Sequence, residues 1–428
     1  MKKIEFKSML VSIILVLLIY YFYTPALNIH AIEFWIFIIV ALCIYGASTS
    51  YSTLLGKKFK PEKVGYLGAA VALIVAGVLV TDLFTSKIFH ASRYASRIEV
   101  ENVKFNNKTL HEVDFSKTPI IDRKSTVKLG DKVMGEIPEY VSQFEVSDDY
   151  TQISYKNSVY RVTPLEYASF FKYLTNSKNG IPAYITVNST NGKAEIVKLK
   201  DLGLNGMKYV PSAILNHNLN RKLQLSYPTS IFGSPSFEVD EKGHPWYVCT
   251  TYTYFGVSNK KKVTGAVLFD PITGKSKKYD KDKVPKWVDR VYPEELIMTE
   301  IDENGSLQDG FFNSVLGQKN VTVTSKGYNY LEKDGDIWIY SGITSANKDS
   351  SNLGFVLSNL RTHQTLRFSC SGANEKAAMK SAEGEVKNYG YDATFPLLVN
   401  VGGHPVYLIS LKDSGGLIKQ YAMVDAKD

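Results

Sequence analysis

Cysteine is scarce in this chain, with only Cys43, Cys249 and Cys370 among 428 residues. So few thiols exclude a small disulfide-rich scaffold. Cys43 lies in an apolar stretch, while Cys249 and Cys370 lie in segments with the alternating pattern of strands. One bridge between those two stays open at this level, because the geometry that a disulfide needs cannot be read from sequence.

Catalytic and metal-binding signatures are also missing. The seven histidines are scattered, no pair has helical ligand spacing, and neither His-Glu-x-x-His nor Gly-x-Ser-x-Gly occurs. Residues 273–276 end like a phosphate-binding loop, but Phe269 stands where that loop needs glycine. Residues 345–348 have Ser-x-x-Lys spacing without the Lys-Thr-Gly partner motif. We therefore predict no catalytic residue, no metal site and no cofactor.

A basic excess is absent from most of the chain, although the formal net charge is +8. Residues 1–98 contain ten Lys or Arg against four Asp or Glu, and residues 99–428 contain 40 against 38. The positive charge is therefore concentrated in the first quarter. Because the remainder lacks the basic footprint of a nucleic-acid-binding protein, we expect no nucleic-acid partner.

What the first quarter does contain is three long apolar stretches, at residues 9–23, 32–47 and 66–84. With their flanking residues, each approaches the roughly 20 residues that a helix needs to cross the hydrocarbon core of a bilayer. None has an ionisable side chain near its centre, so no ion pathway is predicted. We predict a multi-pass protein of the cell membrane, with the lipid bilayer as its first partner.

The distribution of lysines predicts how these spans are oriented. Three lysines precede the first span and four lie between the second and third, whereas residues 24–31 contain neither Lys nor Arg. By the positive-inside rule the N-terminus is cytoplasmic, and residues beyond Phe84 are extracytoplasmic. A cleaved signal peptide over residues 1–31 is the competing interpretation, although the site at its end is a poor one for cleavage. The large domain is exported in either case.

The third span is rich in small residues. Side chains of this size let helices approach closely, which predicts packing against neighbouring helices or against a second copy of the chain. Ordinary enrichment of Gly and Ala in membrane helices is the alternative. The residues are Gly65, Gly68, Ala69, Ala70, Ala72 and Gly77.

The exported part has a strand-rich pattern, in which short alternating segments are separated by Gly, Asn and Asp. Residues 163–166, Thr-Pro-Leu-Glu, form a capping box with Pro at the first helical position. They predict a helix over 163–176 that ends before Gly180. An Asn-Gly turn then predicts a hairpin of residues 181–187 and 193–199.

A similar order recurs near the C-terminus. Ala378, Ala382 and Val386 share one helical face, and Gly402-Gly403 marks a following hairpin. Residues 243–248 and 403–408 also repeat the order Gly-His-Pro-x-Tyr, which is typical of a tight turn that leads into a strand.

We therefore predict an α+β fold: three N-terminal transmembrane helices followed by a strand-rich extracytoplasmic region of repeated helix plus antiparallel-hairpin modules. The predicted units are a membrane domain, an exit helix with a linker, a helix-hairpin module, and a larger α+β region. They cover residues 1–90, 91–132, 133–230 and 231–428.

Residues 265–275 resemble the strand, D-P-x-T-G turn and returning strand of PepSY-type modules, in which a helix packs on a short antiparallel sheet. The chain departs from that pattern because strands rather than a helix lead into Val263. The resemblance implies a binding or regulatory module without catalytic residues in the cell envelope. Similar exported regions follow three spans in proteins of Gram-positive bacteria.

Two polar segments are candidate binding sites. Residues 341–355 are interpreted as a long loop between strands 336–340 and 355–360, with an ordinary surface loop as the alternative. The lysine-rich run 260–290 is interpreted as a basic face for anionic lipid or wall polymer, with a solvated hairpin face as the alternative. The candidate residues are Thr344, Ser345, Asn347, Asp349, Ser351 and Asn352 in the first segment, and Lys260, Lys261, Lys262, Lys277 and Lys278 in the second.

The function predicted from these features is that of a membrane-anchored extracytoplasmic binding or regulatory protein of the cell envelope, without catalysis. Its further partner is an envelope polymer or another membrane protein. The alternative is a cell-envelope hydrolase acting on wall or peptide substrates. That alternative requires a pocket that unites His244 or His404 with a carboxylate and a serine.

Overall fold

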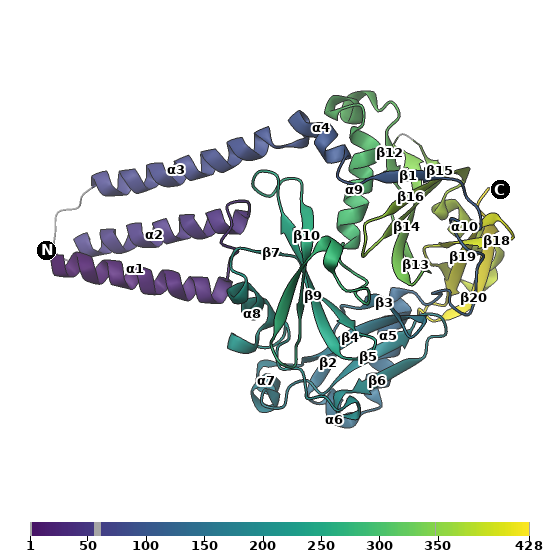
Figure 1. The fold of residues 1–428 in the computed structure, drawn as a ribbon, viewed down its shortest axis with the longest axis horizontal. Coiled ribbons are helices and arrows are strands. Elements are labelled where there is room, and N and C mark those ends of the chain that lie inside the picture. The colour runs from purple at the N-terminus through teal and green to yellow at the C-terminus, as the bar shows by residue number, and fades with distance from the viewer. Residues whose placement is uncertain (1, 55–60, 347, 428) are drawn as a thin grey trace.

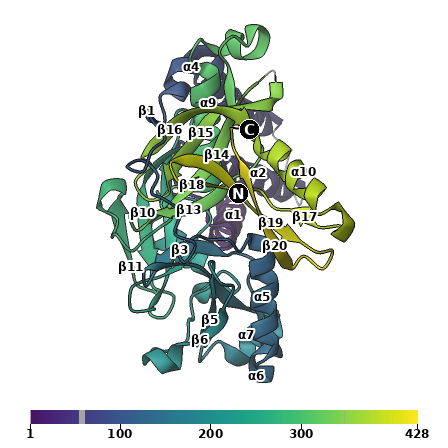
Figure 2. The same ribbon diagram turned by 90° about the vertical axis from the view of Figure 1, so that its right-hand side faces the viewer.

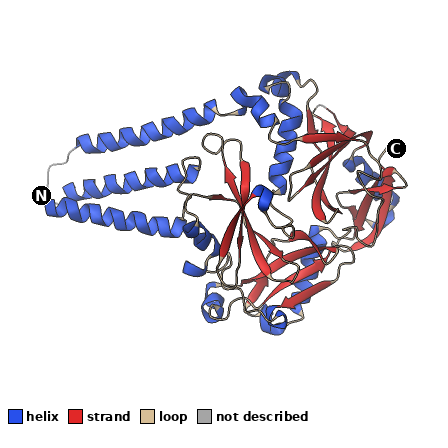
Figure 3. Cartoon of the chain, in the orientation of Figure 1, coloured by secondary structure: helices blue, strands red, loops and turns tan. Residues whose placement is uncertain are grey.

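The computed structural model describes residues 2–54, 61–346 and 348–427. It has a mixed α+β fold, in which three N-terminal helices extend from one side of a strand-rich body (Figure 1, Figure 3). These helices are α1 Lys2–Tyr23, α2 Ile32–Leu54 and α3 Pro61–Phe84. α1 packs on α2, and α2 packs on α3. The predicted α+β class is confirmed.

The predicted number of spans is not supported by the lengths of the apolar stretches within these helices. Among the described residues, one stretch, Val64–Phe84, is both long and apolar enough to cross a membrane. The apolar parts of α1 and α2, Met9–Tyr23 and Ile32–Ser48, are shorter. The physical reason is the composition of the helix ends, because α1 begins with lysines and α2 finishes with Ser, Thr and Tyr.

The first sheet of the body is antiparallel and centres on β4 Ser158–Tyr167. One edge of β4 pairs with β5, which pairs with β6, and the other edge pairs with β3 and then β2. Figure 2 shows α5 alongside β5 and β6. The elements are β2 Phe144–Val146, β3 Thr151–Tyr155, β5 Ala183–Asn188, β6 Ala194–Lys198, α5 Arg123–Gly135, α6 Pro138–Val141 and α7 Phe170–Asn176.

The helix predicted to begin at Thr163 is wrong, because residues 163–166 lie inside β4. Tertiary burial overrides the local capping signal here, since Val162 and Leu165 are completely buried in the sheet core. Pro164 is tolerated because it lies where the neighbour of β4 changes from β3 to β2, so its missing N–H interrupts no ladder on that edge. The helix begins instead after Ser169, whose side chain accepts a hydrogen bond from Lys172 N.

The second sheet has the strand order β11-β10-β9-β7, with β8 also on β9, and all its pairs are antiparallel. Gly243 and Gly274 have φ values of +81° and +71°, which confirms the predicted Gly-His-Pro and Asp-Pro turns. One face of this sheet shares a hydrophobic core with the first sheet. The strands are β7 Ile231–Phe232, β8 Ser236–Val239, β9 Pro245–Thr253, β10 Lys262–Phe269 and β11 Ser276–Asp280.

The third sheet has the order β1-β16-β15-β14-β12, with β13 also on β14. β1 Val100–Val103 runs parallel to β16, so the predicted exit helix ends well before Val100. That helix is α4 Lys87–Ala95, which packs on α9 Glu294–Leu307. The other strands are β12 Thr322–Thr324, β13 Asn329–Lys333, β14 Asp336–Ser345, β15 Lys348–Asn359 and β16 Thr365–Ala373.

The fourth sheet confirms the second predicted module of a helix followed by a hairpin. α10 Glu375–Glu385 precedes a hairpin of β18 and β19 that turns through Gly402 and Gly403. The strands are β17 Asp392–Ala393, β18 Leu397–Val401, β19 His404–Lys412 and β20 Ile418–Asp425. The remaining helical elements of the body are α8 Leu219–Ser226, η1 Leu199–Leu202, η2 Leu215–His217, η3 Lys281–Lys283, η4 Asn313–Gly317 and η5 Lys387–Tyr389.

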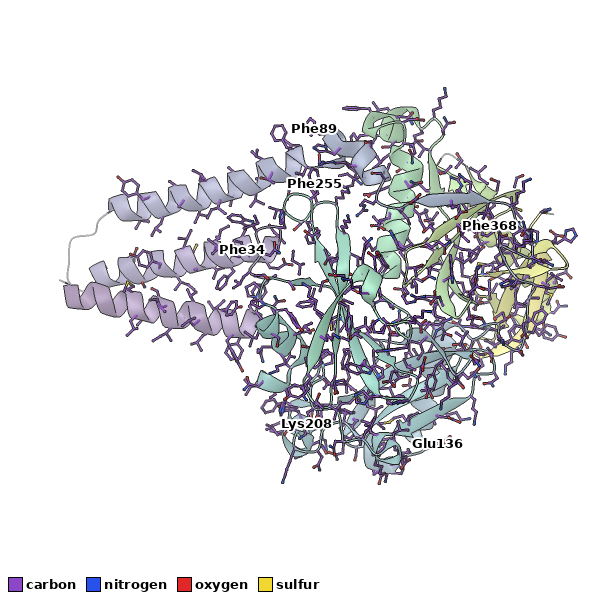
Figure 4. All side chains as sticks on the ribbon, in the orientation of Figure 1. Phe34, Phe89, Glu136, Lys208, Phe255 and Phe368 are labelled. Atoms are coloured by element: carbon purple, nitrogen blue, oxygen red, sulfur yellow. The ribbon has the colours of Figure 1, made fainter. Side chains whose placement is uncertain are left out.

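The body contacts the nearby ends of the N-terminal helices, and the residues between α1 and α2, through hydrogen bonds. Arg221 of α8 donates a hydrogen bond from Nε to the carbonyl oxygen of Tyr21, 2.8 Å away. The hairpin between β9 and β10 reaches toward α3, where Asn259 donates to the carbonyl oxygen of Asp82 at 2.7 Å. Figure 4 labels Phe255 of this hairpin, whose ring lies 4.6 Å below the guanidinium of Arg93 in α4.

Candidate functional site

The candidate site is a cavity of about 670 Å³ where the first, third and fourth sheets meet. Figure 1 shows β3, β13 and β20 converging in this part of the body. The walls come from four segments that are far apart in the sequence. They are the start of α5 (Asp122, Arg123, Lys124, Lys128), strands β3 and β4 with the preceding residue (Tyr150, Gln152, Arg161), the β13 segment (Tyr328, Asn329, Tyr330), and the fourth sheet (Asp392, Ala393, Thr394, Phe395, Lys412, Asp413, Ser414, Gly416).

Arg161 of β4 is the central polar residue of the cavity wall. It is 5% exposed. Its Nε donates to Gln152 Oε1 at 3.1 Å, and its Nη1 donates to Ile121 O at 2.8 Å and to Thr126 Oγ1 at 3.0 Å. All three acceptors are uncharged. Within the described part of the chain, Nη2 has no acceptor and the guanidinium has no carboxylate at ion-pair distance.

A buried cation without a counter-ion is costly, because the effective desolvation penalty amounts to several kcal/mol per ion. This penalty is reflected in the pKa of Arg161, which burial lowers from its ordinary value. The ring of Tyr330, whose centroid lies 6.0 Å from the guanidinium carbon, gives partial compensation.

Two further buried side chains in the wall are incompletely satisfied. Gln152 Nε2 and Tyr150 Oη have no hydrogen-bond partner within the described residues. Each such group costs roughly 1–3 kcal/mol relative to a satisfied one. Burial, and then the nearby Asp131 and Asp148, raises the pKa of Tyr150, which keeps its hydroxyl protonated. Both residues line the cavity, although these two atoms themselves are buried.

The charged residues around the cavity are not balanced. Five cationic side chains line it against three carboxylates. Asp122 is already occupied, because it caps α5 and pairs with Lys412 at 2.5 Å. Burial alone would raise the pKa of Asp122, but hydrogen bonds from Lys412 and Ser125 outweigh burial and lower it. Asp413 pairs with Lys419, which lies outside the lining, at 3.3 Å.

Three aromatic rings complete the wall. Tyr328 and Tyr330 meet edge to face with centroids 5.8 Å apart, and Phe395 of the fourth sheet lies next to this segment, where its carbonyl oxygen accepts a hydrogen bond from Asn329 Nδ2 at 3.2 Å. Tyr330 Oη donates to Glu294 Oε1 at 3.0 Å, which fixes its ring. Such surfaces bury the apolar or ring-shaped part of a ligand, while a few polar groups orient it.

The predicted polar loop over residues 341–355 is wrong, since β14 and β15 extend through it as a hairpin. The two strands continue through this segment because some of its polar side chains are buried: Thr344 is 4% exposed and Asn352 is fully buried. Asn352 Oδ1 accepts from the backbone N–H groups of Ile343 and Gly354, and its Nδ2 donates to Tyr407 Oη at 3.1 Å.

The other residues predicted for that segment lie around the tip of the hairpin. Ser345 pairs with Lys348 across the turn. Asp349 and Ser351 belong to β15, and Asn347 lies outside the described residues. None of the described members of this group lines the cavity, which is formed elsewhere.

The predicted basic face is divided by the strand register. Lys277 and Lys278 pair with Leu268 and Val267, whereas Lys262 lies at the opposite end of β10 and pairs with Thr253. Lys260 is next to the tip of the hairpin between β9 and β10. Lys261 Nζ lies 4.0 Å from the centroid of Tyr252. The Asp-Pro turn therefore folds the arms together without joining these lysines into one cluster.

His244 lies 3.4 Å from Asp270 through Nε2 and Oδ1, but the carboxylate already stabilises a turn. Asp270 accepts hydrogen bonds from Ile272 N, Thr273 N and Thr273 Oγ1. Neither His244 nor His404 lines the cavity. Among the described residues, no group of three His, Cys, Asp or Glu is placed to hold a metal ion.

The question of a disulfide is answered by the structure. Cys249 and Cys370 are both free and buried, and they belong to different hydrophobic cores. Cys43, in α2, is also free.

Comparisons with known proteins identify no family. No family model matches the chain, and no curated protein matches it. Among solved structures, an ACO/RPE65 chimera has a TM-score of 0.15 and 10% identity, covering 67% of this chain and 47% of that chain. A monoclinic crystal form of a variant of that chimera has a TM-score of 0.15 and 8% identity, covering 66% and 50%. The chain therefore spans about half the length of those structures, and such low scores carry no argument about function.

Proposed function

We propose that this chain is a membrane-anchored binding protein of the cell envelope, whose extracytoplasmic body holds a small ligand without chemical conversion. The observation that carries the proposal is the 670 Å³ cavity, because it combines aromatic walls with a buried arginine, Arg161, whose Nη2 has no acceptor among the described residues. Its lining includes no histidine and no cysteine. These features favour binding over a hydrolase.

The proposal assigns α1, α2 and α3 to a membrane anchor. Several observations support that assignment. The helices contain 22, 23 and 24 residues, and they project from the body side by side (Figure 1). At roughly 1.5 Å per residue, each is long enough to reach across a hydrocarbon core of about 30 Å. Their large apolar side chains are exposed, including Leu17, Leu73 and Leu79. The absence of Lys and Arg from residues 24–31 favours an extracytoplasmic body.

The proposed modules are PepSY-like. Support comes from α7 with the β5–β6 hairpin, α10 with the β18–β19 hairpin, and the Asp-Pro hairpin of β10 and β11. The cavity lies between such modules rather than within one. The gaps between modules are common places for ligands to bind.

Protease treatment of spheroplasts tests the topology. We expect externally added protease to degrade the body after Phe84, because that part lies outside the membrane in this proposal. A tag at the N-terminus should survive until the membrane is permeabilised. Immunoblotting against both ends measures the result, and a body that stays protected in sealed spheroplasts contradicts the proposal.

Binding is tested with fractions of small molecules extracted from the cell envelope. We expect at least one fraction to raise the Tm of the full chain in detergent. Ala393→Trp should lose this response, because residue 393 lines the cavity and the larger ring fills it. Ser142→Trp, at an exposed position outside the lining, is the matched control and should retain it. A response that is absent, or equal in both variants, contradicts the proposal.

A further inference from the structure

We propose that the ligand of this cavity is a small organic anion, whose carboxylate or phosphate group binds Arg161 and whose apolar or ring-shaped part packs between Tyr328, Tyr330 and Phe395. The inference rests on the proposed function, since it names the chemical class of ligand for the same cavity. Three features of the cavity support this ligand class: the charge of Arg161, the free N–H donors of its guanidinium, and the aromatic residues of the walls.

The charge of Arg161 is not compensated by the chain, because the side chain is 5% exposed and donates only to neutral acceptors. The nearest acidic group in the wall, Asp122, is paired with Lys412 and with the start of α5. Removing a second charge from water would be unfavourable, but an anion that meets a pre-positioned guanidinium regains interaction in a medium of low dielectric constant. An oxyanion therefore supplies the counter-ion that the chain itself lacks at this position.

The free N–H donors of Arg161, those of Nη2, are held in a fixed position that suits an anion. Two of the three guanidinium nitrogens are held by Gln152, Ile121 and Thr126, which fix the plane of the group. Nη2 is left for the ligand. Because the arginine is held before binding, little side-chain entropy is lost when the anion arrives.

Lysines on the rim extend this positive surface. Lys124 is exposed at the first turn of α5 and has no ion-pair partner within the described chain. Lys128 is on the same helix and donates to the carbonyl oxygen of Gly415. Arg123 is tied to the carbonyl oxygen of Asp148 at 2.9 Å. Of the three, Lys124 is the one available to steer an anion toward the cavity.

The carboxylates facing the cavity set the limit on ligand charge. Asp392 and Asp413 belong to the fourth sheet, whose segment 412–416 contacts the start of α5 through Lys412, Gly415 and Gly416. An anion with one compact charged group can bind Arg161 while its uncharged part lies toward the aromatic residues of the wall. A polyanion would meet these carboxylates, so a single charged group is favoured.

Three probes separate charge from ring binding: inorganic phosphate, phenyl phosphate and benzyl alcohol. With the full chain in detergent, we expect calorimetric titration to give saturable binding for phenyl phosphate and weaker binding for phosphate. Benzyl alcohol should not bind detectably. The order follows because phenyl phosphate uses both the guanidinium and the aromatic walls. Equal binding of benzyl alcohol and phenyl phosphate would overturn the proposal.

Substitutions locate the charge that matters. Arg161→Gln should weaken phenyl phosphate binding about tenfold or more, because a hydrogen bond to a charged group is lost. Lys124→Gln should weaken it a few-fold, as expected for an exposed steering charge. Lys132→Gln, on α5 but outside the lining, is the control and should change it less than twofold. Unchanged affinity in folded Arg161→Gln contradicts the proposal.

A measurement on the wild-type chain keeps the test decisive if Arg161→Gln does not fold. Raising the salt concentration should weaken phenyl phosphate binding and leave any binding of benzyl alcohol unchanged. Binding that is insensitive to salt contradicts the proposal. If an envelope fraction stabilises the wild type but not Ala393→Trp, while neither anionic probe binds, the anion inference fails and the proposed binding function stands.

Discussion

Replacing Arg97 with alanine is expected to lower the free energy of unfolding by about 3–5 kcal/mol, because buried Glu303 loses its shortest ion pair and keeps only the longer one to Lys87. Arg97 follows α4, and its side chain is 5% exposed. Nη2 lies 2.5 Å from Glu303 Oε2, and Nη1 lies 3.9 Å from Glu300 Oε1. Nη1 also donates to the carbonyl oxygen of Lys261 at 2.9 Å. One side chain thus joins the exit segment, α9 and the β9–β10 hairpin.

Chemical denaturation of the full chain in detergent measures this loss. Arg93→Ala is the matched control, because Arg93 is exposed on the same helix and only stacks over Phe255. It should cost less than about 1 kcal/mol. Arg97→Lys should recover part of the stability, since it restores the charge but not the fork of donors. Equal losses in Arg97→Ala and Arg93→Ala would contradict this account.

The elements that could be predicted from sequence are those that depend on their own turn residues. Asn191-Gly192 and Gly402-Gly403 both produce hairpins, and Gly192, Gly402 and Gly403 all have positive φ values. The Asp-Pro turn is set by Asp270, whose carboxylate accepts from the next backbone groups. Such turns need no distant partner, so a few neighbouring residues are sufficient to specify them.

The predictions that are wrong concern segments whose structure depends on contacts with residues far away in the sequence. Thr163 and Pro164 carry a helix signal, but the strands on both sides of β4 bury that segment in a sheet. Thr344 and Asn352 look like residues of a polar loop, but they pair with each other across β14 and β15. Buried hydrogen bonds satisfy the side-chain amide of Asn352, which a composition-based interpretation cannot detect. Local propensity is a weak prior in such positions.

The cavity could not be predicted from the sequence, for the same reason. Its walls come from residues near 122–128, 150–161, 328–330 and 392–416, and no spacing within one segment relates them. Two local signals did exist. Asp122 is a favourable N-cap for α5, and Arg161 interrupts the apolar positions of a strand. A buried arginine in a strand requires a partner or a ligand, and only the folded chain shows that the partners are neutral.

Stability is expected to fall as the pH rises from about 5 to about 8, because two carboxyl groups are buried close to one another, Glu238 in β8 and Asp289 in the segment before α9. Glu238 is fully buried and Asp289 is 2% exposed. Burial raises the pKa of Glu238 to about 7. Burial, and then the charge of Glu238, raises the pKa of Asp289 well above its ordinary value. Both groups therefore stay protonated longer in the folded state than in the unfolded chain.

The direction of the effect follows from proton linkage. Below the ordinary values of 4.5 and 3.8, both states are protonated and the full stability is present. Above those values the unfolded chain releases protons that the folded state retains, so stability declines until Glu238 ionises near pH 7. At roughly 1.4 kcal/mol per pKa unit, Glu238 alone accounts for a decline on the order of 3 kcal/mol. Asp122, Asp270 and Glu294 have lowered pKa values, so they act below this range.

Urea denaturation at pH 5, 6, 7 and 8 measures the decline in the full chain. Asp289→Asn should make the decline shallower, because it removes one of the two titrating groups, while the part that comes from Glu238 remains. The amide oxygen can still accept the hydrogen bond that Ser154 N donates at 2.7 Å. Asp282→Asn is the control, since that side chain is 83% exposed and should leave the pH dependence unchanged. If the free energy of unfolding instead stays constant or rises between pH 5 and pH 8, Glu238 and Asp289 are ionised in the folded state at both pH values, and the prediction is wrong. Ser154 belongs to β3, the strand that also carries Gln152 of the cavity wall, so this hydrogen bond helps to hold that strand in place.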